Sequence, residues 1–226
     1  MEQVLKNIHT LFESLPFLMS GLKMTIFLSI VSVTASFFIG IFLAMLRLSK
    51  RRILRYPTAA YIETVRATPL LMVIFWVFFL LPIVIHRKVD PIVSVLIAFI
   101  GFNSTYIAEI VRAGILALPK GQMDAAHATG LSYFQAMTFV ILPQALKNMI
   151  PALINRFVAT FKSTSLAYII GVIEFFRAAV IVNNREFISY EIFAFVAFVY
   201  FICCYSMSFA SKVIEKKLGP SSNIRF

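Results

Sequence analysis

The chain has 226 residues, of which 60% are hydrophobic and 14% are charged, and phenylalanine alone occurs 24 times. A soluble domain of this length has too little interior to bury so much apolar surface, so the composition excludes a soluble protein. The net charge of +11 would favour nucleic-acid binding in a soluble protein. Here the basic residues lie in short segments between apolar runs, which indicates a topology signal in a lipid bilayer and no nucleic-acid partner.

Five apolar runs reach the length of about 20 residues that crosses a bilayer. They predict an all-α integral membrane protein with five transmembrane helices. An amphipathic lead-in at residues 1–17 precedes the first helix, and the second helix begins amphipathically near Thr58. The expected spans are about Leu18–Leu46, Thr58–Ile85, Ile92–Leu116, Met149–Ile173 and Phe187–Ser211, the second becoming fully apolar at Leu70. We expect one transmembrane domain at residues 18–216 and a cytoplasmic tail at residues 217–226.

The basic residues are shared unevenly between the two sides of this predicted bundle. Twelve Lys and Arg residues lie in the loop after the first span, around the segment between the third and fourth spans, and in the tail, whereas five lie on the opposite side. Lys and Arg accumulate on the cytoplasmic side of membrane proteins. We therefore expect the N-terminus outside and the C-terminus in the cytoplasm.

Two E-x-x-R pairs occur near the cytoplasmic ends of the second and third spans, Glu63 with Arg66 and Glu109 with Arg112. Each pair places opposite charges one turn apart on one helix face. Because the second span enters from the cytoplasm and the third leaves there, both pairs lie at a similar depth. In one interpretation they cross-pair, Glu63 with Arg112 and Glu109 with Arg66, and close the inner mouth of a pathway. In the other they are intrahelical surface pairs that contribute little.

The segment between the third and fourth spans, about residues 119–145, is neither a good transmembrane span nor an ordinary loop. Small residues suit close backbone approach to a partner, and a glycine permits a sharp turn after a short helix. An acidic residue near the start of that helix would complement its dipole. The residues in question are Gly121, Asp124, Ala125, Ala126 and Gly130. Alone, the segment fits either a docking element or an ordinary helix-turn-helix connection.

The segment is similar to the EAA loop of permease subunits of ABC importers. That pattern reads Glu-Ala-Ala, three residues, Gly, nine residues, Ile, any residue, Leu-Pro. The chain has Asp124-Ala125-Ala126, Gly130, Val140 and Leu142-Pro143 at those spacings, with Asp and Val replacing Glu and Ile. Stretches such as "YIETVRATPLLMVIFW", "AEIVRAGI" and "FKSTSLAYIIGVIEFFRAA" resemble the polar amino-acid uptake branch over about residues 18–216. "RATPLLMVIFWVFFLLP" and "EFFRAA" most resemble its glutamate/aspartate members.

The resemblance implies a permease of the bacterial cytoplasmic (inner) membrane that works by alternating access. Its partners would be ABC ATPase subunits, an extracytoplasmic substrate-binding protein and a second permease chain, either identical or a sister chain. The segment would be a cytoplasmic coupling helix that inserts into a groove on the ATPase. The sequence contains no G-x-x-x-x-G-K-[ST] phosphate loop. ATP and Mg²⁺ would therefore be used by the partner ATPase, with no cofactor bound by this chain.

Polar residues interrupt the apolar third and fourth spans at comparable depth. Lys162 lies near the middle of the fourth span, where a charge is costly and usually faces a cavity or a partner. These residues could line a substrate pathway, or they could be hydrogen-bonding contacts between helices. Many relatives have Asp where this chain has Ser163. The candidate pathway residues are Asn103, Ser104, Lys162, Ser163, Thr164 and Ser165.

Other functions remain as alternatives. The same importer architecture could carry a different solute, such as another amino acid or an oxoanion. A membrane enzyme would need convergent acid/base or metal-ligating residues at one depth, and a passive channel would need no docking segment. No His, Cys or carboxylate cluster has metal-ligand spacing, and Cys203 and Cys204 fit apolar packing. We expect no metal site and no catalytic residue.

Overall fold

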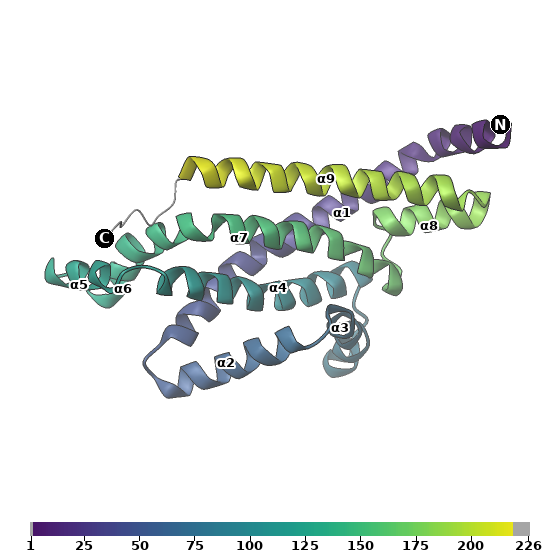
Figure 1. Ribbon diagram of the computed structural model, residues 1–226. Coiled ribbons are helices and arrows are strands. Elements are labelled where there is room, and N and C mark those ends of the chain that lie inside the picture. Colours follow the sequence, from purple (N-terminus) through teal and green to yellow (C-terminus); the bar gives the residue numbers. More distant parts are fainter. Residues whose placement is uncertain (1, 219–226) are drawn as a thin grey trace.

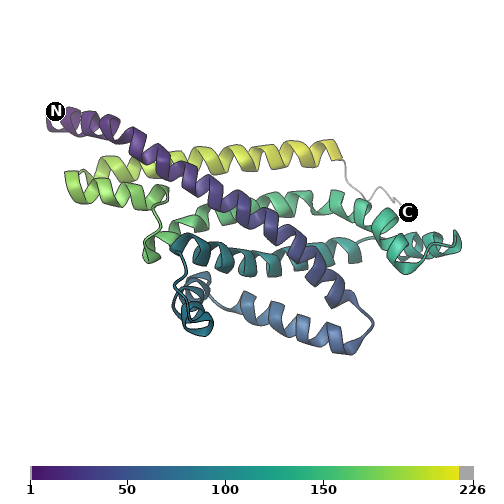
Figure 2. The ribbon, with the colours of Figure 1, turned by 180° about the vertical axis from the view of Figure 1, so that it is seen from behind.

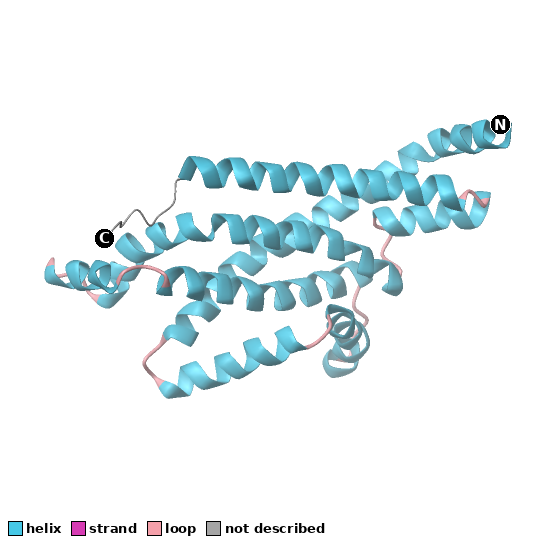
Figure 3. Ribbon diagram, viewed as in Figure 1, coloured by secondary structure: helices cyan, strands magenta, loops and turns pink. Residues whose placement is uncertain are grey.

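The computed structural model describes residues 2–218, and every regular element in that range is helical (Figure 3). The all-α class predicted from the sequence is confirmed for these residues. In chain order the elements are α1 (Glu2–Leu48), α2 (Arg52–Ala67), α3 (Leu70–Ile85), α4 (Pro91–Leu116), α5 (Lys120–Ala128), α6 (Tyr133–Ala136), the π-helix η1 (Met137–Ile141), α7 (Leu142–Ser163), the 3₁₀-helix η2 (Thr164–Ile170), α8 (Phe175–Glu186) and α9 (Ser189–Leu218).

Helices α1, α4, α7 and α9 run along the length of the molecule, with α1 crossing the others obliquely (Figures 1 and 2). α4 is central, because α1, α2, α3 and α7 all pack against it. Apolar side chains fill the bundle from one end to the other. Leu18 belongs to the cluster nearest the N-terminus, Phe99 to a middle cluster and Met149 to the cluster at the opposite end.

The two ends of the bundle carry different parts of the chain. The start of α1 and helix α8 lie at one end, whereas α5, α6 and the last turns of α9 lie at the other (Figure 1). The loop between α1 and α2 lies toward this second end. The segments richest in Lys and Arg therefore gather at the end that carries α5.

Four stretches of the described chain are long and apolar enough to cross a membrane: Leu5–Leu48, Pro91–Leu116, Tyr133–Ile170 and Ser189–Lys216. The expected second span is not one straight helix, because α2 and α3 meet at a bend of 106°. The break falls at Thr68-Pro69. Proline disfavours helical geometry in the preceding residue, and Thr68 adopts extended backbone angles. If the bent pair counts as one span, the number rises to five.

Other boundaries differ from the expected ones. The amphipathic lead-in and the first span form one continuous helix, α1, which runs through Pro16. The fourth span ends in the tight turns of η2, and Gly171 follows with a φ of +88°. Helix α8, which the sequence did not predict, then packs against α1. Most of the predicted tail, residues 217–226, lies outside the described residues.

Close packing of α1 on α4 depends on Gly40. A Cβ at this position would lie 2.6 Å from Cγ2 and 2.8 Å from Cβ of the buried Ile107. We expect Gly40→Ala to lower the stability by about 1–3 kcal/mol, because overpacking forces the two helices apart. Thermal unfolding of the purified protein measures this. Gly101→Ala in α4 is the control, since its Cβ would meet only the Tyr61 hydroxyl, at 3.8 Å. If Gly40→Ala and wild type have the same melting temperature, α1 and α4 do not pack as closely at Gly40 as described.

Candidate functional site

The docking segment predicted from the sequence is a short helix followed by a glycine turn. Helix α5 has nine residues and begins directly after Pro119. Gly130 has a φ of +83°, a left-handed conformation that other residues adopt only with strain. The chain then restarts at Ser132, whose side chain and that of Gln135 form a reciprocal capping box for α6. The two short helices extend beyond the long ones at one end of the molecule (Figure 1).

The five residues assigned to this segment do not all face outward. Asp124, Ala125, Gly121 and Gly130 are exposed, whereas Ala126 is 5% exposed and packs inside the chain. Asp124 is the fifth residue of α5, and the first turn holds no acidic residue. The expected interaction of Asp124 with the start of the helix dipole was therefore wrong, because that effect is confined to the first turn. The exposed Asp124 carboxylate is instead presented to the surroundings.

One side-chain contact joins α5 to α7. Gln144 Nε2 donates to Gln122 Oε1 over 3.2 Å. Between the two helices lies η1, a single π-helical turn, and α5 packs against it. π-turns are rare and occur often at functional sites. A displacement of α5 thus has a direct route into α7.

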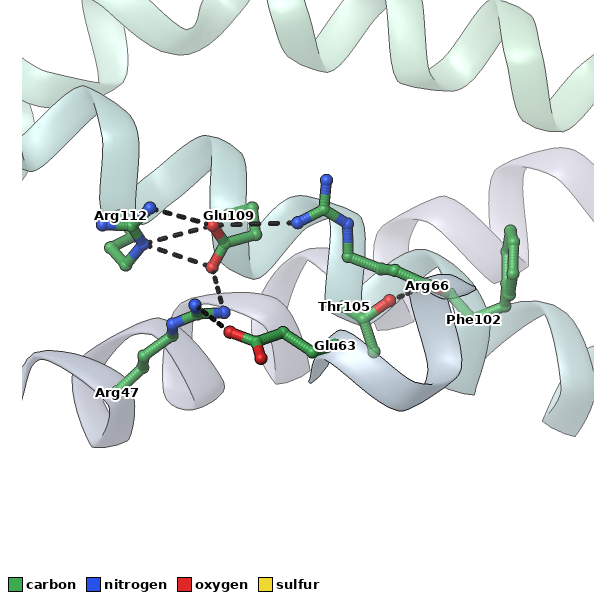
Figure 4. Close-up of polar contacts among 7 residues, drawn as sticks. All are labelled: Arg47, Glu63, Arg66, Phe102, Thr105, Glu109 and Arg112. Carbon is green, nitrogen blue, oxygen red and sulfur yellow. Dashed lines mark hydrogen bonds and ion pairs between the residues drawn. The ribbon is translucent and has the colours of Figure 1, made fainter. Parts of the chain in front are cut away.

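A cluster of charges gathers around Glu109 of α4 (Figure 4). Its carboxylate lies 2.7 Å from Arg47 Nη1 of α1, 3.0 Å from Arg112 Nη2 of α4 and 3.7 Å from Arg66 Nη1 of α2. Glu63 Oε1 accepts from Arg47 Nη2 over 2.8 Å. The Glu109 side chain is 16% exposed and the Glu63 side chain 66%. Glu109 is therefore the less exposed of the two acids and the centre of a network that ties three helices together.

The network agrees only in part with the predicted cross-pairing. Glu109 does meet Arg66, and it also keeps its intrahelical partner Arg112. The expected pair of Glu63 and Arg112 is absent from the ion pairs of the described residues, and Glu63 contacts Arg47 instead. Arg47 was missed because the sequence analysis counted it with the loop. Its place in the last turn of the long α1 directs it towards α4.

A second polar cluster lies between α4 and α7. The buried Asn103 Oδ1 accepts from Arg156 Nε over 2.8 Å, from Arg156 Nη2, and from Thr160 Oγ1 over 3.1 Å. The Arg156 guanidinium also lies over the rings of Tyr106, 3.9 Å from its centroid, and Phe102, at 5.4 Å. Arg156 lies within the expected fourth span but was not among the predicted pathway residues. The predicted pathway residue Asn103 could have pointed to Arg156, because a buried amide in a span needs a hydrogen-bond partner on a neighbouring helix.

The other predicted pathway residues do not join this cluster. The hydroxyls of Ser104, Thr164 and Ser165 each donate to the carbonyl oxygen three residues earlier in the chain, over 2.7–2.9 Å. Lys162 is exposed and, with Ser165, lines a pocket against α8 and α9 that also includes Tyr200. Ser163 is partly buried. The structure therefore divides the expected pathway set into two separate places.

A groove borders the charge network and extends along α4 to Tyr106. It has a volume of about 480 Å³, and its lining includes Arg66, Tyr106, Glu109, Gly114 and Met149. Tyr106 is shared by both clusters, because Arg66 lies 5.0 Å from the centroid of its ring and Arg156 lies 3.9 Å from it. The groove therefore follows one face of α4 and leads from the α5 end towards the middle of the bundle.

Near the opposite end lies a buried acid that the sequence analysis did not single out. Glu174 is fully buried at the start of α8 and accepts from the backbone N–H groups of Phe176, at 2.9 Å, and Arg177, at 2.7 Å. Thr25 of α1 and Tyr200 of α9 also reach its carboxyl, at 3.5 and 3.4 Å. Burial raises the pKa of this carboxyl. Glu174 thus holds α8 to α1 and α9.

With this geometry in place, comparison with known proteins identifies the family. The model of the family described as "Binding-protein-dependent transport system inner membrane component" matches residues 36–220. The chain belongs to this family. It is thereby an inner membrane component of a transport system, as its apolar helices require.

Individual relatives of this inner membrane component cover nearly the whole chain. The probable glutamine ABC transporter permease protein GlnP of Bacillus subtilis is 36% identical, covering 90% of this chain and 94% of its own length. The glutamate/aspartate import permease protein GltK of Escherichia coli O6:H1 is 33% identical, and the match covers 92% of this chain and 96% of GltK. The crystal structure of an amino acid ABC transporter with histidines superposes with a TM-score of 0.84 at 30% identity, covering 92% and 96%.

The charge network of this transport component predicts unequal roles for its two acids. Glu109→Gln should lower the stability by about 1–3 kcal/mol, because it removes the charge that three guanidiniums, none of them fully exposed, share. Glu63→Gln should lower the stability by less than about 1 kcal/mol, because the Glu63 side chain of the Arg47–Glu63 pair is exposed. Thermal unfolding of the two matched variants compares them. A larger loss from Glu63→Gln would contradict the placement of Glu109 at the centre.

Proposed function

We propose that the chain is the transmembrane permease subunit of an ATP-driven importer that carries a polar amino acid across the bacterial cytoplasmic membrane. Family membership supports a partner ATPase and a substrate-binding protein in general terms. The curated relatives support an amino acid as the solute, since their names specify glutamine and glutamate/aspartate. The alternatives of a passive channel or a membrane enzyme lack a feature in the described residues that favours them.

The observation that carries the proposal is the exposed α5–Gly130 segment at one end of an apolar bundle. In this proposal α5 is the coupling helix, which the ATPase grips on the cytoplasmic side. Asp124, Ala125 and the Gly130 turn would contact the ATPase, and Ala126 would hold α5 to its own chain. ATP and Mg²⁺ would be bound by the ATPase alone.

The proposed topology has five spans, with the bent α2–α3 pair as the second. The N-terminus then lies outside and α9 ends in the cytoplasm. The gathering of basic segments at the α5 end supports this direction. A second permease chain, identical or a sister chain, would complete the pathway.

Alternating access would use the two features that adjoin α5. ATP-driven closure of the ATPases would move α5, and the Gln122–Gln144 contact would pass the movement to α7. The network around Glu109 joins α1, α2 and α4 near the same end, and it would hold the inner mouth in one state. Its ion pairs are partly exposed, so they can exchange partners at modest cost.

Gly130→Ala tests the coupling role. A Cβ at a φ of +83° meets no neighbour but forces an L-residue into the left-handed region, at a cost of roughly 1–2 kcal/mol. We expect the turn to rearrange and ATP-driven amino-acid uptake by the reconstituted importer to fall by roughly tenfold, which corresponds to about 1.4 kcal/mol. Co-purification of the ATPase should weaken in parallel.

Gly171→Ala is the matched control. Gly171 has a similar φ of +88° and equally open surroundings, but it follows η2, away from α5. This variant should lose comparable stability while keeping its association with the ATPase. If both variants lose uptake equally and neither loses the ATPase, the strain acts through stability, and α5 is not the coupling helix.

A further inference from the structure

The guanidinium of Arg156 is the unusual charge of this bundle. It lies in α7, within the Tyr133–Ile170 span, and its hydrogen-bond partner is the neutral amide of Asn103. None of the ion pairs among the described residues includes it. A charge inside a membrane domain is costly and normally faces a partner or a water-filled cavity. The partly buried Arg156 therefore lacks a counter-charge among the described residues, and an anion from outside them would supply one.

The surroundings of Arg156 prepare it for an anion. Asn103 Oδ1 receives two of its N–H groups, and the Tyr106 ring supports the guanidinium plane at 3.9 Å. Thr160 holds Asn103 from the same helix as Arg156. A planar guanidinium fixed in this way keeps its remaining N–H groups in the fork geometry that matches a carboxylate.

The electrostatic balance of the groove favours a ligand with net negative charge. Arg66 reaches the same Tyr106 ring, at 5.0 Å, and its own contact to Glu109 is loose, at 3.7 Å. Glu109 is already shared among three guanidiniums. Arg66, which lines the groove, and Arg156 thus lie beside one aromatic ring, and Glu109 of the groove is already committed to other partners. Such a site attracts an anion and repels a cationic amino acid.

We propose that Arg156 is a carboxylate receptor within the transport pathway, and that the preferred substrate is an acidic amino acid whose second carboxylate Arg66 meets across Tyr106. The inference rests on the proposed importer function and adds the substrate class to it. Asn103 and Tyr106 are positioning residues, because they orient the guanidinium.

The test compares L-glutamate with L-glutamine, which have nearly the same shape and differ by one charge. Equilibrium binding of each radiolabelled amino acid is measured on the complete permease–ATPase complex in lipid nanodiscs, without the binding protein. Wild type should bind glutamate at least roughly tenfold more tightly than glutamine. Arg156→Gln should weaken glutamate binding by roughly ten- to a hundredfold, the range of a charge-assisted hydrogen-bonded pair.

Asn103→Asp serves as a second variant that keeps the arginine. It places a carboxylate of the chain itself against Arg156, so glutamate binding should fall as strongly while the melting temperature is kept or raised. If Arg156→Gln does not fold, this variant decides the question. Arg52→Gln removes the same charge from an exposed position at the start of α2 and should leave binding and uptake unchanged.

Several results would overturn the inference. These are equal affinity for the two amino acids, no binding of either by wild type, or unchanged glutamate binding in Arg156→Gln or Asn103→Asp. In another contradicting outcome, Arg156→Gln dissociates the two permease chains but the protein still prefers glutamate. The anion that pairs with Arg156 would then belong to a neighbouring subunit and not to the substrate. If wild type binds glutamate and glutamine equally but still takes up glutamine with ATP, the inference about Arg156 fails and the proposed importer function remains. Absence of ATP-driven uptake of any amino acid would instead remove the function itself.

Discussion

Polar and charged side chains inside an apolar bundle need hydrogen-bonding partners, and α4 is the helix that supplies most of them here. Glu109 on α4 gathers arginines from α1, α2 and α4 itself, and Asn103 on the same helix holds Arg156 of α7. Because lipid cannot replace these contacts, the helices that carry the arginines must pack around α4. The central position of α4 thus follows from its polar residues as much as from its apolar ones.

The same constraint links the two ends of the proposed mechanism. α7 begins beside α5 through the Gln122–Gln144 contact, and further along it carries Arg156. A movement that starts at α5 therefore reaches a guanidinium in the interior through one helix. The π-turn η1 lies on this route, directly before α7. Glu174 at the far end holds α8 to α1 and α9.

Much of this arrangement could be predicted from the sequence. The apolar runs identified the long helices, and the spacing from Asp124 to Pro143 identified the short docking helix and its glycine turn. The contacts of Glu63 and Lys162 could not be predicted, because helix rotation and tilt depend on tertiary packing. The bend at Pro69 was missed because hydropathy averages over a proline. Arg156 was assigned no role because a single arginine in an apolar stretch carries no periodic signal.

The account as a whole depends on α5 lying on the cytoplasmic face, where an ATPase can reach it. Accessibility of a cysteine at position 125 to a membrane-impermeant maleimide measures this directly. The experiment uses Ala125→Cys in a background with Cys203 and Cys204 replaced by serine, because the two native thiols would otherwise contribute signal. The account predicts labelling in inverted membrane vesicles, protection when the ATPase is bound, and none in intact cells. Labelling in intact cells would contradict it.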